Sequence, residues 1–203
     1  MSESPIPLCF IGDGITLGHG DPEGGGFALR LCANAAAEGV ALDPIREGGK
    51  FWSSREVAAN WEQLLEHHLG PEPTGGLVFC FGGRDCDDLA RGQRVPIEET
   101  IQLGIEIIRA AADRAPLFVI GPPSTGDTIV NRRILLVSRV LRTISEQCGA
   151  PYFAACEAMM GSRPWIADMA AGDGIHPRAD GAQALADAIS DTANWRGWLS
   201  LPL

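Results

Sequence analysis

The chain has 203 residues, 45% of them hydrophobic, and a formal net charge of −10. This length suits one domain with a substantial core, so we expect residues 1–203 to form a single domain. The acidic composition, with a pI of about 4.8, argues against a general nucleic-acid-binding protein, which would present a basic face. It suits a protein that acts on small molecules.

The cysteines and the N-terminal segment bear on where the protein resides. None of the six cysteines forms a CxxC pair, which favours reduced, mostly buried thiols in a cytoplasmic protein. The first glycine motif begins at Gly12 with no charged and then apolar segment before it, so we expect no signal peptide. No apolar run approaches transmembrane length, and we expect no association with a membrane.

Short apolar runs and helical stripes alternate along the chain. Five alternations predict an α/β protein with a doubly wound parallel sheet and right-handed crossovers. Trp195 and Trp198 are expected to dock the C-terminal segment. In chain order, the pattern predicts a strand at 6–11, a helix at 27–37, a strand at 40–45, a helix at 55–68, a strand at 77–81, a polar loop at 82–95, a helix from about 97 to 112, a strand at 117–120, a helix at 129–148, a strand from 151 to 154, a short helix near Trp165 and a last helix after Gly181.

Three segments carry polar residues that suit a functional site. Asp13 follows the first strand inside a glycine-flanked turn, and Arg84 and Asp85 follow the third strand. Asp173 and His176 lie three positions apart near the C-terminus. Because sites in open α/β sheets form at the carboxyl ends of the strands, we expect these segments to meet there.

This order of motifs resembles the GDSL or SGNH hydrolase family. The family has Gly-Asp-Ser near the N-terminus, then a glycine block, Gly-x-Asn-Asp and Asp-x-x-His. The resemblance runs from Gly12 to the helix after His176, with Gly48 or Gly49 as the glycine block. It implies a single three-layer α/β/α domain with a flavodoxin-like five-stranded sheet of order 2-1-3-4-5. It also implies a small-molecule substrate and neither a cofactor nor a metal.

The resemblance assigns a role to each motif. In the family, a serine attacks an acyl carbonyl, a histidine takes its proton and an aspartate orients the histidine. His176 would then be the base and Asp173 its orienting carboxylate, which fixes the tautomer of the imidazole. The oxyanion and substrate positions would be Asp13, Gly14, Gly48, Gly49 and Arg84.

Two of the four motifs depart from the family pattern. Gly14 stands at the position of the serine and has no side chain to act as a nucleophile, and loss of the serine from a protease triad costs about a million-fold in turnover. Its backbone N–H remains, and the missing hydroxymethyl leaves room for a water beside His176. Arg84 stands at the position of the asparagine, and its guanidinium suits a carboxylate or a phosphate. Alternatively, Arg84 forms an exposed ion pair with Asp85, Asp87 or Asp88.

Other residues compete for roles at the site. A replacement nucleophile would have to come from nearby hydroxyls or thiols, and His19 is a candidate to border the pocket. Trp52 and Trp165 are candidates to line an apolar pocket, although aromatic side chains more often serve packing. The replacement nucleophiles we consider are Thr16, Ser53, Ser54 and Cys86.

Three functional hypotheses follow. The first is an enzyme in which His176 and Asp173 act as a general base without a serine, in hydrolysis by water attack, elimination or cyclisation. The second is a non-catalytic protein that binds a small acyl or anionic molecule. The third is an ordinary acyl-ester hydrolase whose serine was replaced in the laboratory by Gly14 to trap a complex. The second change, at Arg84, argues against it, because such a trap needs only one change.

Overall fold

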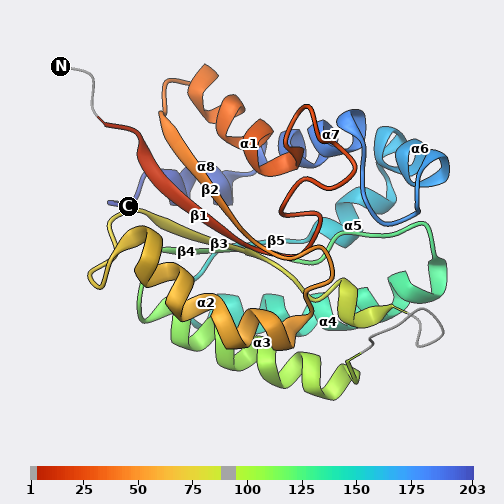
Figure 1. The fold of residues 1–203 in the computed structure, drawn as a ribbon, viewed down its shortest axis with the longest axis horizontal. Helices are drawn as coiled ribbons and strands as arrows, with labels where there is room; N and C mark the ends of the chain where they lie inside the picture. Colours follow the sequence, from red (N-terminus) through yellow and green to blue (C-terminus); the bar gives the residue numbers. More distant parts are fainter. Residues whose placement is uncertain (1–3, 88–94) are drawn as a thin grey trace.

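The protein, described here by a computed structural model over residues 4–87 and 95–203, is built on one five-stranded parallel sheet (Figure 1). The strand order is β2-β1-β3-β4-β5, which confirms the predicted order. All four neighbouring pairs are parallel. The strands are β1 (Ile6–Gly12), β2 (Leu42–Gly48), β3 (Gly76–Cys80), β4 (Leu117–Ile120) and β5 (Tyr152–Phe153).

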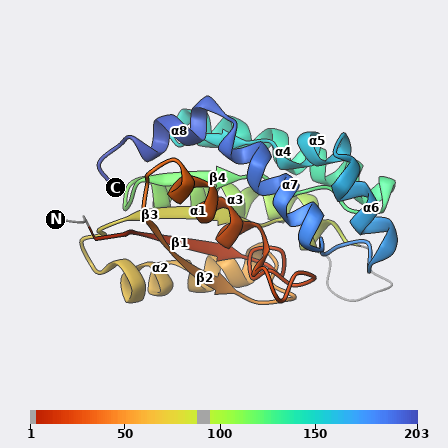
Figure 2. The ribbon, with the colours of Figure 1, turned by 90° about the horizontal axis from the view of Figure 1, so that it is seen from above.

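Helices cover both faces of the sheet and complete the three-layer α/β/α architecture (Figure 1). One face carries α2 (Ser54–Leu69), α3 (Ile97–Ala112) and α4 (Thr128–Gln147). Figure 2 shows α1 and α7 lying together across the other face. That layer contains α1 (Gly26–Ala37), α6 (Arg163–Ala171), α7 (Ala179–Ser190) and α8 (Ala193–Leu199), while α5 (Ala155–Met160) packs between α4 and α6.

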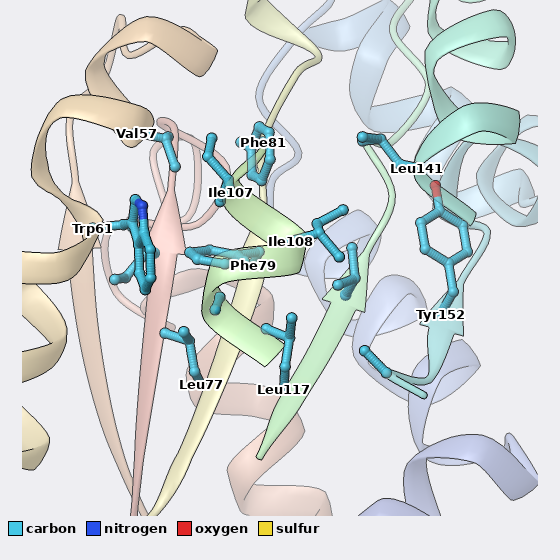
Figure 3. Packing of buried hydrophobic residues seen from close by; sticks show 14 of the residues in the cluster. Val57, Trp61, Leu77, Phe79, Phe81, Ile107, Ile108, Leu117, Leu141 and Tyr152 are labelled. Carbon is cyan, nitrogen blue, oxygen red and sulfur yellow. The ribbon is translucent and has the colours of Figure 1, made fainter. Parts of the chain in front are cut away.

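The strands are buried on both faces because successive side chains point into different helical layers. In β3, Leu77 and Phe79 enter the core under α2, α3 and α4, whereas Val78 and Cys80 enter the core on the opposite face. Figure 3 shows the first of these cores, in which Phe79 lies edge-on to Trp61 with ring centres 6.1 Å apart. Apolar burial of this extent supplies most of the driving force for folding.

Several boundaries differ from the predicted ones. β2 runs on to Gly48, so the glycine block starts within a strand, and Pro44 is tolerated because β2 is an edge strand. α5 and α8 were not predicted because they have only 6 and 7 residues, too few to show a helical period. Gly181 lies inside α7 rather than before it. Trp195 and Trp198 of α8 are buried against Phe118.

The segment predicted as a polar loop contains a 3-10 turn at Arg84–Cys86. Its residues Asp88, Arg91 and Arg94 lie outside the described part of the chain. Within the residues that the structure describes, no helix is long and apolar enough to cross a membrane.

The close approach of β1 and β2 yields a stability prediction. Gly48 has φ +145°, and a Cβ placed on it would lie 1.9 Å from the carbonyl oxygen of Gly12. We expect Gly48→Ala to lower the free energy of unfolding by about 3 kcal/mol, because the backbone must shift and stay strained. Chemical denaturation measures this.

Gly197→Ala is the matched control. Gly197 is exposed in α8, and an added Cβ there meets nothing within 4 Å. We expect this change to raise stability by about 0.5–1 kcal/mol, because alanine favours a helix over glycine. Equal unfolding midpoints for the two variants would contradict the account of the β1–β2 approach.

Candidate active site

Loops that follow four strands meet one loop from the C-terminal part of the chain around a small cavity. Gly14 follows β1, Lys50 follows β2, Arg84 follows β3 and Thr125 follows β4, while His176 comes from the loop between α6 and α7. The cavity lies at the carboxyl ends of the strands, where the parallel topology predicts a site. It is lined by Asp13, Gly14, Ile15, Lys50, Gly83, Arg84, Asp87, Pro123, Thr125, Ile175 and His176.

His176 and Asp173 form a hydrogen-bonded pair. Nδ1 of His176 lies 2.7 Å from Oδ2 of Asp173. The other carboxylate oxygen of Asp173 accepts the backbone N–H groups of Ile175 at 2.9 Å and of His176 at 2.8 Å. Partial burial opposes ionisation of Asp173, but these hydrogen bonds outweigh it and lower the pKa of Asp173 to about 2. The carboxylate therefore fixes the ring and leaves Nε2 free to accept a proton.

Nε2 of His176 points at Gly14. A Cβ placed on Gly14 would lie 2.6 Å from Nε2 and 3.1 Å from the carbonyl oxygen of Lys50. A contact of 2.6 Å is shorter than carbon and nitrogen atoms adopt without a bond. The imidazole thus lies where a side chain at residue 14 would begin, and a serine fits there only if the ring moves.

Buried polar contacts order the long loop after β1. Asp21 is buried, accepts the N–H groups of Gly24 and Gly26, and pairs with Arg30 at 2.9 Å. Arg46 of β2 donates to the carbonyl oxygens of Leu17 and Gly25.

The same loop brings His19 beside His176. The two ring centres are 5.7 Å apart, and the N–H of His19 donates to the carbonyl oxygen of Gly14. Burial, the charge of His176 and the charge of Lys50 lower the pKa of His19. His19 therefore lies beside the base, in surroundings that disfavour its positive charge, but it is not among the residues that line the cavity.

Asp13 is an almost fully buried acid in the cavity wall. It is 7% exposed, and its Oδ1 accepts the N–H of Ile15 at 3.0 Å. Burial raises the pKa of Asp13 to about 6, although the N–H of Ile15 and the charge of His176 work against the rise. Across residues 4–87 and 95–203, no group of three His, Cys, Asp or Glu side chains is placed to hold a metal ion.

Arg84 pairs with Asp87 and still lines the cavity. Both side chains are 17% exposed, so the pair is more enclosed than the solvent-facing pair that the sequence allowed. The guanidinium carbon of Arg84 also lies 5.2 Å from the centre of the Phe51 ring. Asp88, the third candidate partner, lies outside the described residues.

Asp85 connects two loops that line the cavity. It is 1% exposed, and its Oδ1 accepts the N–H of Ser54, the first residue of α2, at 2.9 Å. Burial raises the pKa of Asp85, while hydrogen bonds from Ser54 lower it. The loop after β2 is therefore attached to the loop after β3 at the base of the site.

The two predicted glycine-block residues are not among those that line the cavity. Gly48 pairs with Gly12 between the strands, and a Cβ on Gly49 would meet the Trp52 ring at 2.3 Å. Trp52 packs against the core beneath α2. Lys50, the next residue, lines the cavity instead. The only feature of the sequence that could have indicated Lys50 as a site residue is its place after the glycines.

The four candidate replacement nucleophiles lie away from the cavity lining. Thr16 donates to the carbonyl oxygen of Cys80, and Cys86 donates to that of Gly82. Ser53 caps α2 in a capping box with Glu56, and Ser54 is fully buried.

A larger cavity of about 670 Å³ adjoins the one at His176. Asp87, Thr125 and Ile175 line both. Trp165, a predicted pocket residue, lines the larger cavity, and its ring N–H donates to the carbonyl oxygen of Ser124 at 2.9 Å. A substrate longer than the group beside His176 has room to extend in this direction.

The fold and the site together define the class of protein. The family model of the GDSL-like lipase/acylhydrolase family matches residues 10–184. The chain belongs to this family.

The chain is similar to one known protein in sequence and to others in fold. The chain is similar to a GDSL lipase from Mycobacterium tuberculosis, with 28% identity over 193 residues that cover 91% of this chain and 80% of the relative. Its fold is similar to that of an acetylxylan esterase from Geobacillus stearothermophilus, with a TM-score of 0.76, 19% identity and coverage of 98% and 95% of the two chains. An α/β hydrolase enzyme from the metagenome of Lake Arreo gives a TM-score of 0.73, 22% identity and 97% coverage of both chains. Catalytic mutants of the acetylxylan esterase replace a serine, an aspartate and a histidine by alanine.

The buried side chain of Asp13 makes the stability of the fold depend on pH. Folded Asp13, with its pKa near 6, holds its proton more tightly than the unfolded chain does, so the folded state loses stability as the pH rises from about 4 to about 6. We expect Asp13→Asn to raise the free energy of unfolding by about 2–3 kcal/mol at pH 7.5 and by little at about pH 4. Urea denaturation at the two pH values measures this.

Asp43→Asn serves as the control, because Asp43 is exposed on β2. It removes the same charge and is expected to change stability by less than about 0.5 kcal/mol at either pH. A gain for Asp13→Asn that is equal at both pH values would show that burial does not raise the pKa of Asp13.

Proposed function

We propose that this chain is an acyl-ester hydrolase in which His176, oriented by Asp173, activates a water molecule in place of a serine. Nε2 of His176 takes a proton from the water, and the water oxygen bonds to the acyl carbon. The bond from the acyl carbon to the alcohol oxygen then breaks, and His176 returns the proton to the leaving alcohol. Asp173 stays ionised throughout.

The observation that carries the proposal is the position of His176. Nδ1 is held by Asp173, while Nε2 points at a residue without a side chain. The cavity that both residues line has a volume of about 20 Å³, and a water molecule needs about 10–15 Å³ of such space. The imidazole takes the place of the missing side chain, so the room for water expected there is not found, but the base lines a water-sized space beside it.

Charge that develops on the acyl oxygen needs donors. The backbone N–H of Gly14 does not depend on a side chain and remains available for this role. Lys50 brings a positive charge to the same cavity, and so does Arg84, whose charge is paired with that of Asp87. The known relatives support acyl chemistry, since they include a lipase and an acetylxylan esterase.

One observation favours a second candidate, a non-catalytic binding protein. Arg84 pairs with Asp87, so its guanidinium is already engaged and does not replace the neutral donor of an asparagine. A protein that only binds its ligand needs no oxyanion donor. Turnover that depends on His176 separates the two candidates.

The test measures hydrolysis of a short-chain nitrophenyl ester. We expect His176→Ala to lower kcat/KM by about 10²–10⁴-fold, because general base catalysis contributes a factor of this size. Asp173→Asn is expected to lower kcat by a comparable factor, because the amide no longer fixes the tautomer.

His67→Ala and Asp43→Asn are the matched controls, since both side chains are exposed and neither lines the cavity. We expect them to keep full activity. If His176→Ala is as active as the parent chain, the proposed function is wrong and the binding protein is favoured.

A further inference from the structure

Two cationic side chains from different loops converge at the mouth of the cavity beside His176. Lys50 follows β2 and Arg84 follows β3, and both line this cavity. Nζ of Lys50 lies 5.6 Å and Cζ of Arg84 lies 5.2 Å from the centre of the Phe51 ring. Phe51 is 60% exposed, so the shared ring holds both charges at the opening rather than in the core.

Arg84 already binds a carboxylate at this position. Its partner Asp87 also lines the cavity. A guanidinium offers a planar set of donors that matches a carboxylate, whereas the asparagine of the family motif is neutral. The pair therefore shows that a carboxylate fits beside Arg84 at the cavity wall.

Lys50 supplies a second positive charge. Among the ion pairs of residues 4–87 and 95–203, none places a carboxylate within 4.0 Å of Lys50. The protein as a whole carries a charge of −10, so its net charge repels anions. A cation at a cavity mouth then concentrates an anionic ligand at the site.

We infer that the substrate carries a carboxylate group, which Lys50 and Arg84 bind at the mouth of the cavity while the ester group lies beside His176. In the absence of this substrate, Asp87 pairs with Arg84. The substrate carboxylate therefore competes with Asp87 for the guanidinium. Lys50 and Arg84 are thus specificity-determining residues. The inference rests on the proposed function for the place of the reacting group, but its test measures binding alone.

The test compares two small amides by calorimetry with the full chain. Succinamate carries one carboxylate, and succinamide has nearly the same size and no charge. We expect succinamate to bind at least about tenfold more tightly, the gain of one charge-assisted hydrogen bond. Equal affinities, or no detectable binding of succinamate at millimolar concentration, would overturn the inference.

Charge-removing variants locate the binding site. Lys50→Gln and Arg84→Gln are each expected to weaken the binding of succinamate about fivefold to tenfold and to leave the affinity for succinamide unchanged. Arg114→Gln removes the same charge from a residue that pairs with Glu66 on α2, away from the cavity, and is expected to change neither affinity. Equal losses in all three variants would mean that only net charge matters.

Asp87→Asn separates ligand binding from a purely structural role of the Arg84–Asp87 pair. If Asp87 competes with the substrate, this variant binds succinamate several-fold more tightly than the parent chain. If the pair only holds the loop, the variant binds more weakly, which contradicts the inference.

The binding test of this inference can succeed or fail independently of the activity test of the proposed function. Preferential binding of succinamate together with full activity of His176→Ala would leave the inference standing and the hydrolase proposal rejected. His176-dependent ester hydrolysis without a preference for succinamate would do the reverse.

Discussion

The close approach of His176 to Gly14 is the constraint on which the rest of the site depends. The imidazole lies where a side chain at residue 14 would begin, 2.6 Å from the position of its Cβ. Only glycine permits this approach, and the cavity that Gly14 and His176 line with nine other residues has space for about one water molecule. The position of the base thus matches the glycine at residue 14. Under the proposed function, this match is what a site that uses water would require.

Two features of the fold place His176 beside Gly14. Parallel strands bring the turn after β1 to the same edge as the loops after β2, β3 and β4. The loop that carries His176 comes from the distant C-terminal part of the chain, and the N–H of Gly126 holds it by donating to the carbonyl oxygen of Gly174 at 2.8 Å. Asp173 then orders its own loop by accepting two backbone N–H groups and the imidazole. Much of the geometry thus comes from backbone contacts, which side-chain replacements at the site leave in place.

The sequence predicts the strands from local patterns, whereas the strand order and the pairing of Asp173 with His176 came from the family resemblance. Buried strands are apolar runs, and an aspartate three residues before a histidine can fold back on it within one turn. The place of Lys50 at the cavity and the pairing of Arg84 with Asp87 do not follow from such patterns, because they depend on how the loops fold and meet. The position of the glycine block was likewise hidden, since β2 continues to Gly48 and moves the next loop forward by a few residues. Short helices such as α8 are missed because their stability comes from packing against Phe118 rather than from their own period.

Pre-steady-state hydrolysis of a nitrophenyl ester tests the central claim most directly. At enzyme concentrations that make the first turnover visible, direct attack by water predicts nitrophenol release that is linear from the start and lost in His176→Ala. It also predicts that the intact chain carries no acyl group during turnover when its mass is measured. A burst equal to the enzyme concentration, with an acylated chain, would show that some side chain still acts as a nucleophile. A rate equal to that of His176→Ala would show that the base activates no water. Either result would contradict the account.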